Sequence, residues 1–104
     1  MFELSRDYEE RKFPSPSLNG ITVYTLPECS KCDYVKKMLD DINKKDTYLF
    51  FDCESYITHS RDEFKRFIFK HMGYVPSDNK LYFPVVFYKG RYLKTYISIL
   101  DYLD

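Results

Sequence analysis

The chain contains no tryptophan and only three glycines and three cysteines among its 104 residues. Three cysteines are too few for the disulfide framework of a small secreted protein, and no second close pair completes a four-cysteine zinc site. The 16 Lys and Arg balance the 16 Asp and Glu, so no net charge favours nucleic acid, an anionic membrane or an acidic substrate. Any binding must therefore come from a local site.

Long apolar runs are absent as well. No stretch approaches the ~20 apolar residues that are needed to cross a bilayer, and residues 1–10 are too polar and acidic for a signal peptide. We therefore expect a cytoplasmic protein without a membrane partner. The length is that of about one domain with its own hydrophobic core.

The first 20 residues show no helical or strand periodicity and end in a segment rich in proline, serine and glycine. We interpret residues 1–19 as an N-terminal extension and linker, and residues 20–104 as the folded domain. Residues 21–26 are β-branched and aromatic and stop at Pro27, which predicts a strand that ends in a loop.

A helix is predicted directly after this loop. Its apolar stripe has the helical spacing i, i+3, i+4 and i+7 and consists of Val35, Met38, Leu39 and Ile42. Residues 47–51 then form a short apolar run that predicts a second, buried strand. One helix between two strands indicates a right-handed parallel βαβ unit.

The second half of the chain predicts a helix and an antiparallel hairpin. Residues 60–63 have the form of a capping box, and Gly73 is placed to end the helix that follows. Residues 82–88 and 91–96 are rich in strand-forming residues and are joined by Lys89 and Gly90, a pair suited to a two-residue turn. With a short helix over the last seven residues, the order is β-α-β-α-β-β-α.

Cys29 and Cys32 are separated by two residues at the predicted helix start. Free N–H groups and the positive end of the helix dipole stabilise a thiolate there, so Cys29 is the expected nucleophile and Cys32 the resolving thiol. Lys31 adds a nearby cation of smaller effect. Such pairs also ligate metals or occur by chance, and a buried structural role is the remaining alternative.

These residues resemble a known family. Residues 21–42 are similar to the opening of the dithiol glutaredoxins, and residues 83–90 are similar to their cis-proline strand and hairpin. The resemblance implies an α/β, thioredoxin-like fold in which helices flank a four-stranded mixed sheet. It also implies a redox-active disulfide and a thiol-disulfide oxidoreductase.

The resemblance assigns substrate binding to Phe83 and Pro84. Only ~5–6% of bonds before proline are cis, but in similar proteins this bond is cis and the preceding residue offers its backbone to glutathione or a peptide. Ile97 and Ser98 occupy the place where the family holds a glutathione carboxylate, without the usual Gly-Gly and Asp pattern. Leu26 stands where a lysine is common. These departures favour a disulfide-bearing protein over glutathione as the substrate.

Two other functions stay open at this point. Some similar proteins hold an iron–sulfur cluster between two subunits, and others retain the fold as non-catalytic interaction domains. We expect a monomeric enzyme that reduces protein or glutathione mixed disulfides, with no metal, no tightly bound cofactor and no nucleic-acid partner. Its partner is either glutathione, as a candidate co-substrate, or a disulfide-bearing protein. Cys53, after the second strand, is interpreted as a packing residue.

Overall fold

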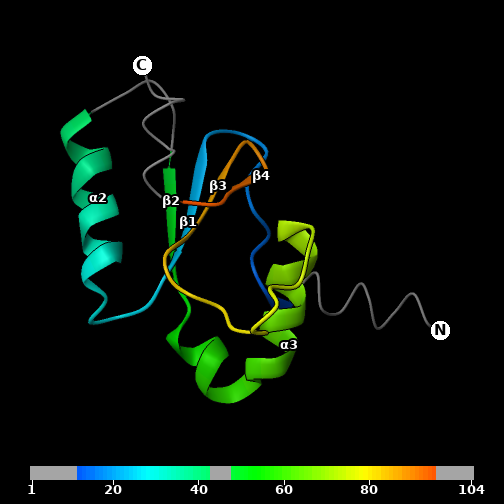
Figure 1. The fold of residues 1–104 in the computed structure, drawn as a ribbon. Coiled ribbons are helices and arrows are strands. Elements are labelled where there is room, and N and C mark those ends of the chain that lie inside the picture. The colour runs from blue at the N-terminus through cyan, green and yellow to red at the C-terminus, as the bar shows by residue number, and fades with distance from the viewer. Residues whose placement is uncertain (1–11, 43–47, 96–104) are drawn as a thin grey trace.

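The computed structural model describes residues 12–42 and 48–95. Its elements follow the order β1 (Ile21–Thr25), α2 (Ser30–Ile42), β2 (Tyr48–Asp52), α3 (Glu54–Met72), β3 (Val85–Tyr88) and β4 (Arg91–Leu93) (Figure 1). This is the order that the sequence predicts for a thioredoxin-like α/β fold. The helix expected over residues 98–104 lies outside the described residues, and so does the side chain of Ile42.

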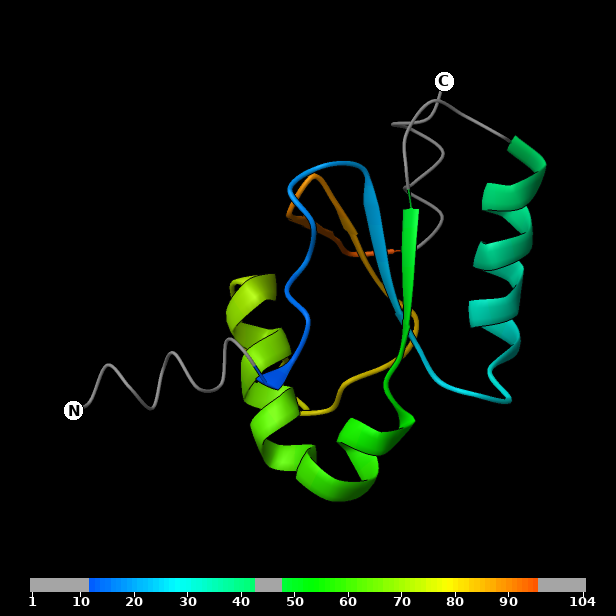
Figure 2. The ribbon, with the colours of Figure 1, turned by 180° about the vertical axis from the view of Figure 1, so that it is seen from behind.

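The four strands form one mixed sheet in the order β2-β1-β3-β4. β1 is parallel to β2 and antiparallel to β3, and β4 is antiparallel to β3. The two helices lie on opposite faces of this sheet, as the opposite views of Figures 1 and 2 show together. The predicted parallel first half and antiparallel second half are both confirmed.

Strand β2 differs from its prediction as a buried strand. It lies at the edge of the sheet, and Leu49 on it is 44% exposed. An edge strand has a neighbour on one side only, so its apolar composition does not secure burial. Tyr48, Phe50 and Phe51 are half-buried and pack against the two cores described next.

Alternation along β1 supplies both faces of the sheet with core residues. Ile21 and Val23 pack with Val35 and Leu39 of α2, whereas Tyr24 belongs to the cluster on the other face. That second cluster is largely aromatic and contains Phe13, Tyr24, Phe64, Phe67 and Phe87. The predicted apolar stripe of α2 is therefore confirmed at its described buried positions, Val35 and Leu39.

The segment that precedes β1 contributes to the aromatic cluster. Phe13 is 1% exposed, and its ring lies 5.2 Å from the rings of both Tyr56 and Phe64. The hydroxyl of Tyr24 donates a hydrogen bond of 2.6 Å to the carbonyl oxygen of Pro14. The sequence pattern did not indicate this packing, because residues 12–19 show no periodicity.

The start of α3 corrects the prediction of a helix beginning at the capping box. The helix begins at Glu54, whose N–H donates to the carboxylate of Asp52 at 2.9 Å. Ser60, the first residue of the predicted box, is non-helical, with φ −147° and ψ 44°, and marks a kink, so the second part of α3 begins where the box predicts. The predicted end is confirmed, because Gly73 adopts φ 94° and donates its N–H to the carbonyl of Phe69.

The hairpin forms as predicted, with shorter strands. Lys89 and Gly90 both have positive φ, 50° and 84°, which is the conformation that a tight two-residue hairpin turn requires. Residues 82–84 are not part of β3, and residues 94 and 95 are not part of β4. The extended segment before β3 is therefore free of sheet pairing, and this segment carries Phe83.

Candidate functional site

The turn between β1 and α2 places Cys29 at the N-cap of the helix. The chain leaves β1 after Thr25 and passes Glu28, which adopts a φ of 56°. The carbonyl oxygen of Cys29 then accepts the N–H of Asp33 at 3.0 Å, the first turn of α2. An N-cap side chain lies where the unpaired N–H groups of a helix point.

The two cysteines lie at disulfide distance. They are joined as Cys29–Cys32 with their Cα atoms 5.2 Å apart, and the N–H of Cys32 points at the Sγ of Cys29 from 3.2 Å. Cys29 is half-buried, whereas Cys32 is only 3% exposed. This arrangement is compatible with redox function, because one cysteine is only partly buried and the other is enclosed beside it.

Phe83, from the other half of the chain, lies beside Cys29. Its carbonyl oxygen lies 3.9 Å from the Sγ of Cys29, although the two residues are far apart in the sequence. The Phe83–Pro84 peptide bond is cis, as the family resemblance leads one to expect. The structure therefore brings Cys29, Cys32 and Phe83 together, and Pro84 directly follows.

The other predicted residues form no contact with the site that the structure describes. Lys31 is exposed in the first turn of α2. Ile97 and Ser98 are outside the described residues, so their predicted contact with a carboxylate stays a prediction. Leu26 is half-buried and packs against the aromatic core, which gives it a structural reason to be apolar.

The third cysteine occupies a similar place after the neighbouring strand. Cys53 follows β2 and is the N-cap of α3, but it is fully buried and its side chain makes no cap hydrogen bond. Its N–H donates to the carbonyl of Thr25, and its thiol donates to the carbonyl of Phe51 at 3.4 Å. Burial raises the pKa of the Cys53 thiol to about 12, so it stays protonated and unreactive at neutral pH.

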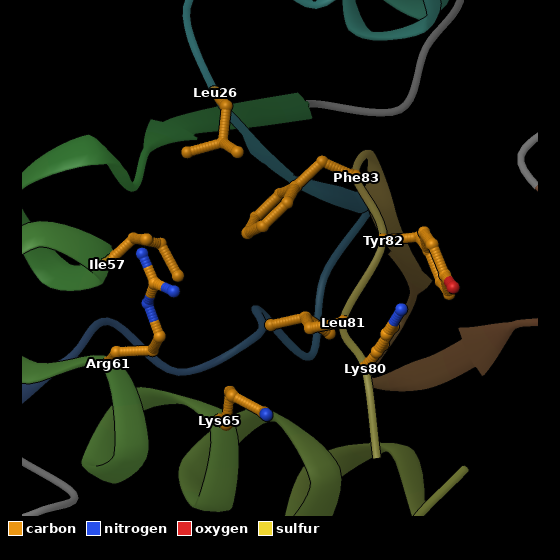
Figure 3. A pocket seen from close by; sticks show the side chains of 8 residues that line it. All are labelled: Leu26, Ile57, Arg61, Lys65, Lys80, Leu81, Tyr82 and Phe83. Atoms are coloured by element: carbon orange, nitrogen blue, oxygen red, sulfur yellow. The ribbon is translucent and has the colours of Figure 1, made fainter. Parts of the chain in front are cut away.

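Helix α3 contributes residues beside the site that the sequence did not connect with it. Ile57, Arg61 and Lys65 line one hollow together with Phe83 (Figure 3). Arg61 and Lys65 are four residues apart and lie on one face of the part of α3 that follows the kink at Ser60, whereas Ile57 precedes the kink. That spacing was visible in the sequence, but no sequence feature indicated that this face lies opposite Phe83.

Among residues 12–42 and 48–95, no cluster of three or more His, Cys, Asp or Glu side chains is arranged to hold a metal ion. No helix in the same ranges combines the length and the apolar character that crossing a membrane requires.

Comparison of the chain with protein-family models, with curated proteins and with solved structures finds no match. The resemblance to the glutaredoxins therefore rests on the quoted motifs. The structural support for a function comes from the geometry of the cysteine pair and of Phe83.

Proposed function

We propose that this protein is a glutaredoxin-like thiol-disulfide oxidoreductase that acts through Cys29 and Cys32. The observation that carries the proposal is the pairing of a half-buried cysteine with an enclosed one at a helix start. The N–H of Cys32 points at the Sγ of Cys29, and a hydrogen bond to sulfur favours the thiolate over the thiol. Cys29 is therefore the group equipped for nucleophilic attack.

The reaction takes place in two exchanges. The Cys29 thiolate attacks one sulfur of a substrate disulfide, forms a mixed disulfide and releases the other substrate sulfur as a thiolate that takes a proton from solvent. Cys32 then loses its proton and attacks the Sγ of Cys29, which releases the second substrate thiol. The substrate gains two electrons, and the protein is left with the Cys29–Cys32 disulfide.

A second dithiol or two molecules of glutathione must reduce the protein again for turnover. The reducing conditions of the cytoplasm would keep the pair in its dithiol form, so we propose that compartment as its place of action. Cys32 is 3% exposed, which leaves Cys29 as the sulfur that a bulky substrate reaches. The resolving step is then internal to the protein.

The preferred substrate in this proposal is a protein disulfide. Phe83 can offer main-chain atoms to a bound polypeptide beside Cys29, and such pairing does not depend on charged side chains. The two carboxylates of glutathione need cationic or N–H partners, and the family's lysine is replaced by Leu26. Each lost charge-assisted contact should cost about 1.5–3 kcal/mol, or roughly tenfold to a hundredfold in affinity.

A pair of kinetic assays tests the proposal. The reduced protein should reduce a protein disulfide such as that of insulin, and it should show a high KM for a glutathione mixed disulfide. Leu26→Lys should lower that KM by roughly tenfold, while Leu26→Met, which preserves the packing, should leave it unchanged. No reduction of either substrate would contradict the enzymatic function, and ordinary glutathione kinetics in the unmodified protein would contradict the substrate preference.

An absorbance spectrum separates this function from the iron–sulfur alternative. A cluster held by cysteine thiolates is coloured, whereas a dithiol enzyme is colourless. A coloured protein that loses colour with Cys29→Ser and has no exchange activity would favour the cluster-binding module instead.

A further inference from the structure

Two hollows of opposite charge lie beside the cysteine pair. The basic hollow, of about 390 Å³, is lined by Leu26, Ile57, Arg61, Lys65, Leu81 and Phe83 among others. The acidic hollow, of about 380 Å³, is lined by Leu26, Pro27, Glu28, Glu54, Ile57 and Thr58. Because Leu26 and Ile57 belong to both linings, the hollows adjoin along an apolar ridge formed by these two side chains.

The basic hollow lies between α3 and the extended segment before β3 (Figure 3). Arg61 and Lys65 extend from the helix, and the side chains of Leu81 and Phe83 point into the hollow from the opposite side, while Tyr82 points away from it. Side chains of an extended segment alternate in this way. The floor of the hollow is therefore apolar and its rim on the helix is cationic.

Four charged side chains at the two hollows have no ion-pair partner in the part of the chain that the structure describes. Neither Arg61 nor Lys65 forms an ion pair with any residue of ranges 12–42 and 48–95, and the same holds for Glu28 and Glu54. Lys80 also lines the basic hollow, but its charge acts on Asp78. The pKa of the Asp78 carboxyl is lowered by hydrogen bonds from the Lys80 N–H and the Tyr82 hydroxyl and, to a smaller extent, by the charge of Lys80. Arg61 and Lys65 thus supply the uncompensated positive charge.

Each hollow has a lining residue next to Cys29, although Cys29 lines neither hollow. Glu28 of the acidic hollow directly precedes it in the chain, and Phe83 of the basic hollow has its carbonyl oxygen 3.9 Å from the Cys29 Sγ. A polypeptide whose cysteine is attacked by Cys29 therefore passes close to both. Its residues on the two sides of that cysteine meet charges of opposite sign.

We propose that Arg61, Lys65 and Glu54 select polypeptide disulfides in which the reacting cysteine has an acidic residue on one side and a basic residue on the other. This inference rests on the proposed function, since it names the substrate class of the same site. The acidic residue lies over the basic hollow and the basic residue over the acidic hollow. A substrate with the two charges in the opposite chain order meets like charges at both places and reacts more slowly.

Three peptide disulfides test the proposal with the reduced, full-length protein. Each is a symmetrical dimer of a blocked pentapeptide, so that attack on either sulfur is equivalent. The sequences are Lys-Ala-Cys-Ala-Glu, its isomer Glu-Ala-Cys-Ala-Lys, and the neutral Ala-Ala-Cys-Ala-Ala. One charged isomer should react about fivefold faster than the other, as expected for two partly exposed charge pairs, and the difference should shrink at high salt.

Variants of unchanged net charge complete the test. Glu54→Arg combined with Arg61→Glu gives each hollow charges of both signs, so the ratio of the rates with the two charged isomers should fall to about one. Glu54→Gln combined with Arg61→Gln should give an intermediate preference. Lys37→Glu combined with Asp41→Lys, at exposed positions on α2, is the matched control and should keep the preference of the unmodified protein.

The outcomes separate the two proposals. No reaction with the neutral peptide contradicts the exchange function itself. Reaction with the neutral peptide but equal rates for the two charged isomers overturns the charge-selection inference alone, and so does a preference that survives in the Glu54→Arg, Arg61→Glu variant.

Discussion

Cys29 and Cys53 occupy equivalent places in the chain and have opposite properties. Each follows one of the two parallel strands, and each accepts at its carbonyl the N–H of the residue four positions on, which begins a helix. Yet Cys29 is half-buried and has an N–H directed at its sulfur. Cys53 is fully buried, makes no side-chain cap hydrogen bond and has a pKa raised by burial to about 12.

This difference teaches that a helix N-terminus does not by itself produce a reactive thiol. The dipole and the free N–H groups act on both cysteines, but desolvation outweighs them at Cys53. Cys29 is only half-buried, so the penalty of desolvation is smaller there and the helix start can stabilise its thiolate. Replacement of Cys29 and replacement of Cys53 should therefore have very different effects on the rate of disulfide exchange.

The largest expected effect is that of Cys29→Ser. Loss of the nucleophile should reduce the rate of disulfide exchange by roughly a thousandfold or more. Cys53→Ala should keep the rate close to that of the unmodified protein, because the Cys53 thiol does not reach solvent. The rate of insulin disulfide reduction compares the two variants. A normal rate in Cys29→Ser would show that another residue is the nucleophile.

A second, smaller effect is expected for Cys32→Ser. Attack by Cys29 remains, but resolution from within the protein is lost, which should slow turnover of protein disulfides by roughly a hundredfold because an intramolecular thiol is replaced by one from solution. The mixed disulfide should accumulate on Cys29. Mass spectrometry of the intact variant after one turnover measures it, and absence of any adduct would count against the resolving role of Cys32.

The smallest effect concerns stability at alkaline pH. The pKa of Cys53 is raised from 9.0 to about 12, so the folded protein keeps a proton that the unfolded chain releases above pH 9. This stabilisation is fully present below pH 9 and is lost as the pH rises toward 12, with about 1 kcal/mol lost near pH 10. Urea unfolding of the reduced protein near pH 7 and pH 10 measures it.

The comparison variant for this measurement is Cys53→Ala, in which the decrease should be shallower. A residual decrease is expected because burial also raises the pKa of Tyr24. Equal pH dependence of the free energy of unfolding in both proteins would show that Cys53 is not the responsible group.

Local sequence signals predicted much of this fold. The β-branched run before Pro27, the stripe of Val35 and Leu39, and the Lys89 and Gly90 turn each act within a few residues, and the structure confirms the elements that they indicate. The CxxC motif likewise placed Cys29 at a helix start. Signals of this kind depend on periodicity and turn chemistry alone.

The predictions from the sequence were wrong where tertiary contacts determine the structure. α3 starts at Glu54, before the predicted box, because Asp52 caps it and Tyr56 and Ile57 pack against the aromatic core. The edge position of β2 depends on strand order, which no local pattern contains. Phe13 enters the core from a segment without periodicity.

Some residues of the candidate site could be predicted from the sequence and others could not. Cys29 and Cys32 are close in sequence and could be found from their spacing. The resemblance suggested Phe83, but the neighbouring face of α3 with Arg61 and Lys65 is joined to it only by the fold. A sequence cannot show which helix face lies opposite a distant loop.

The most direct test of the central claim is the rate of alkylation of each cysteine in the reduced, folded protein as a function of pH. Peptide mapping after brief treatment with iodoacetamide should show Cys29 modified first, with an apparent pKa below the ~8.5 of a free thiol. Cys32 should react more slowly, and Cys53 only after denaturation. Preferential modification of Cys32 or Cys53 at neutral pH, or equal rates for all three, would contradict the assignment of Cys29 as the nucleophile.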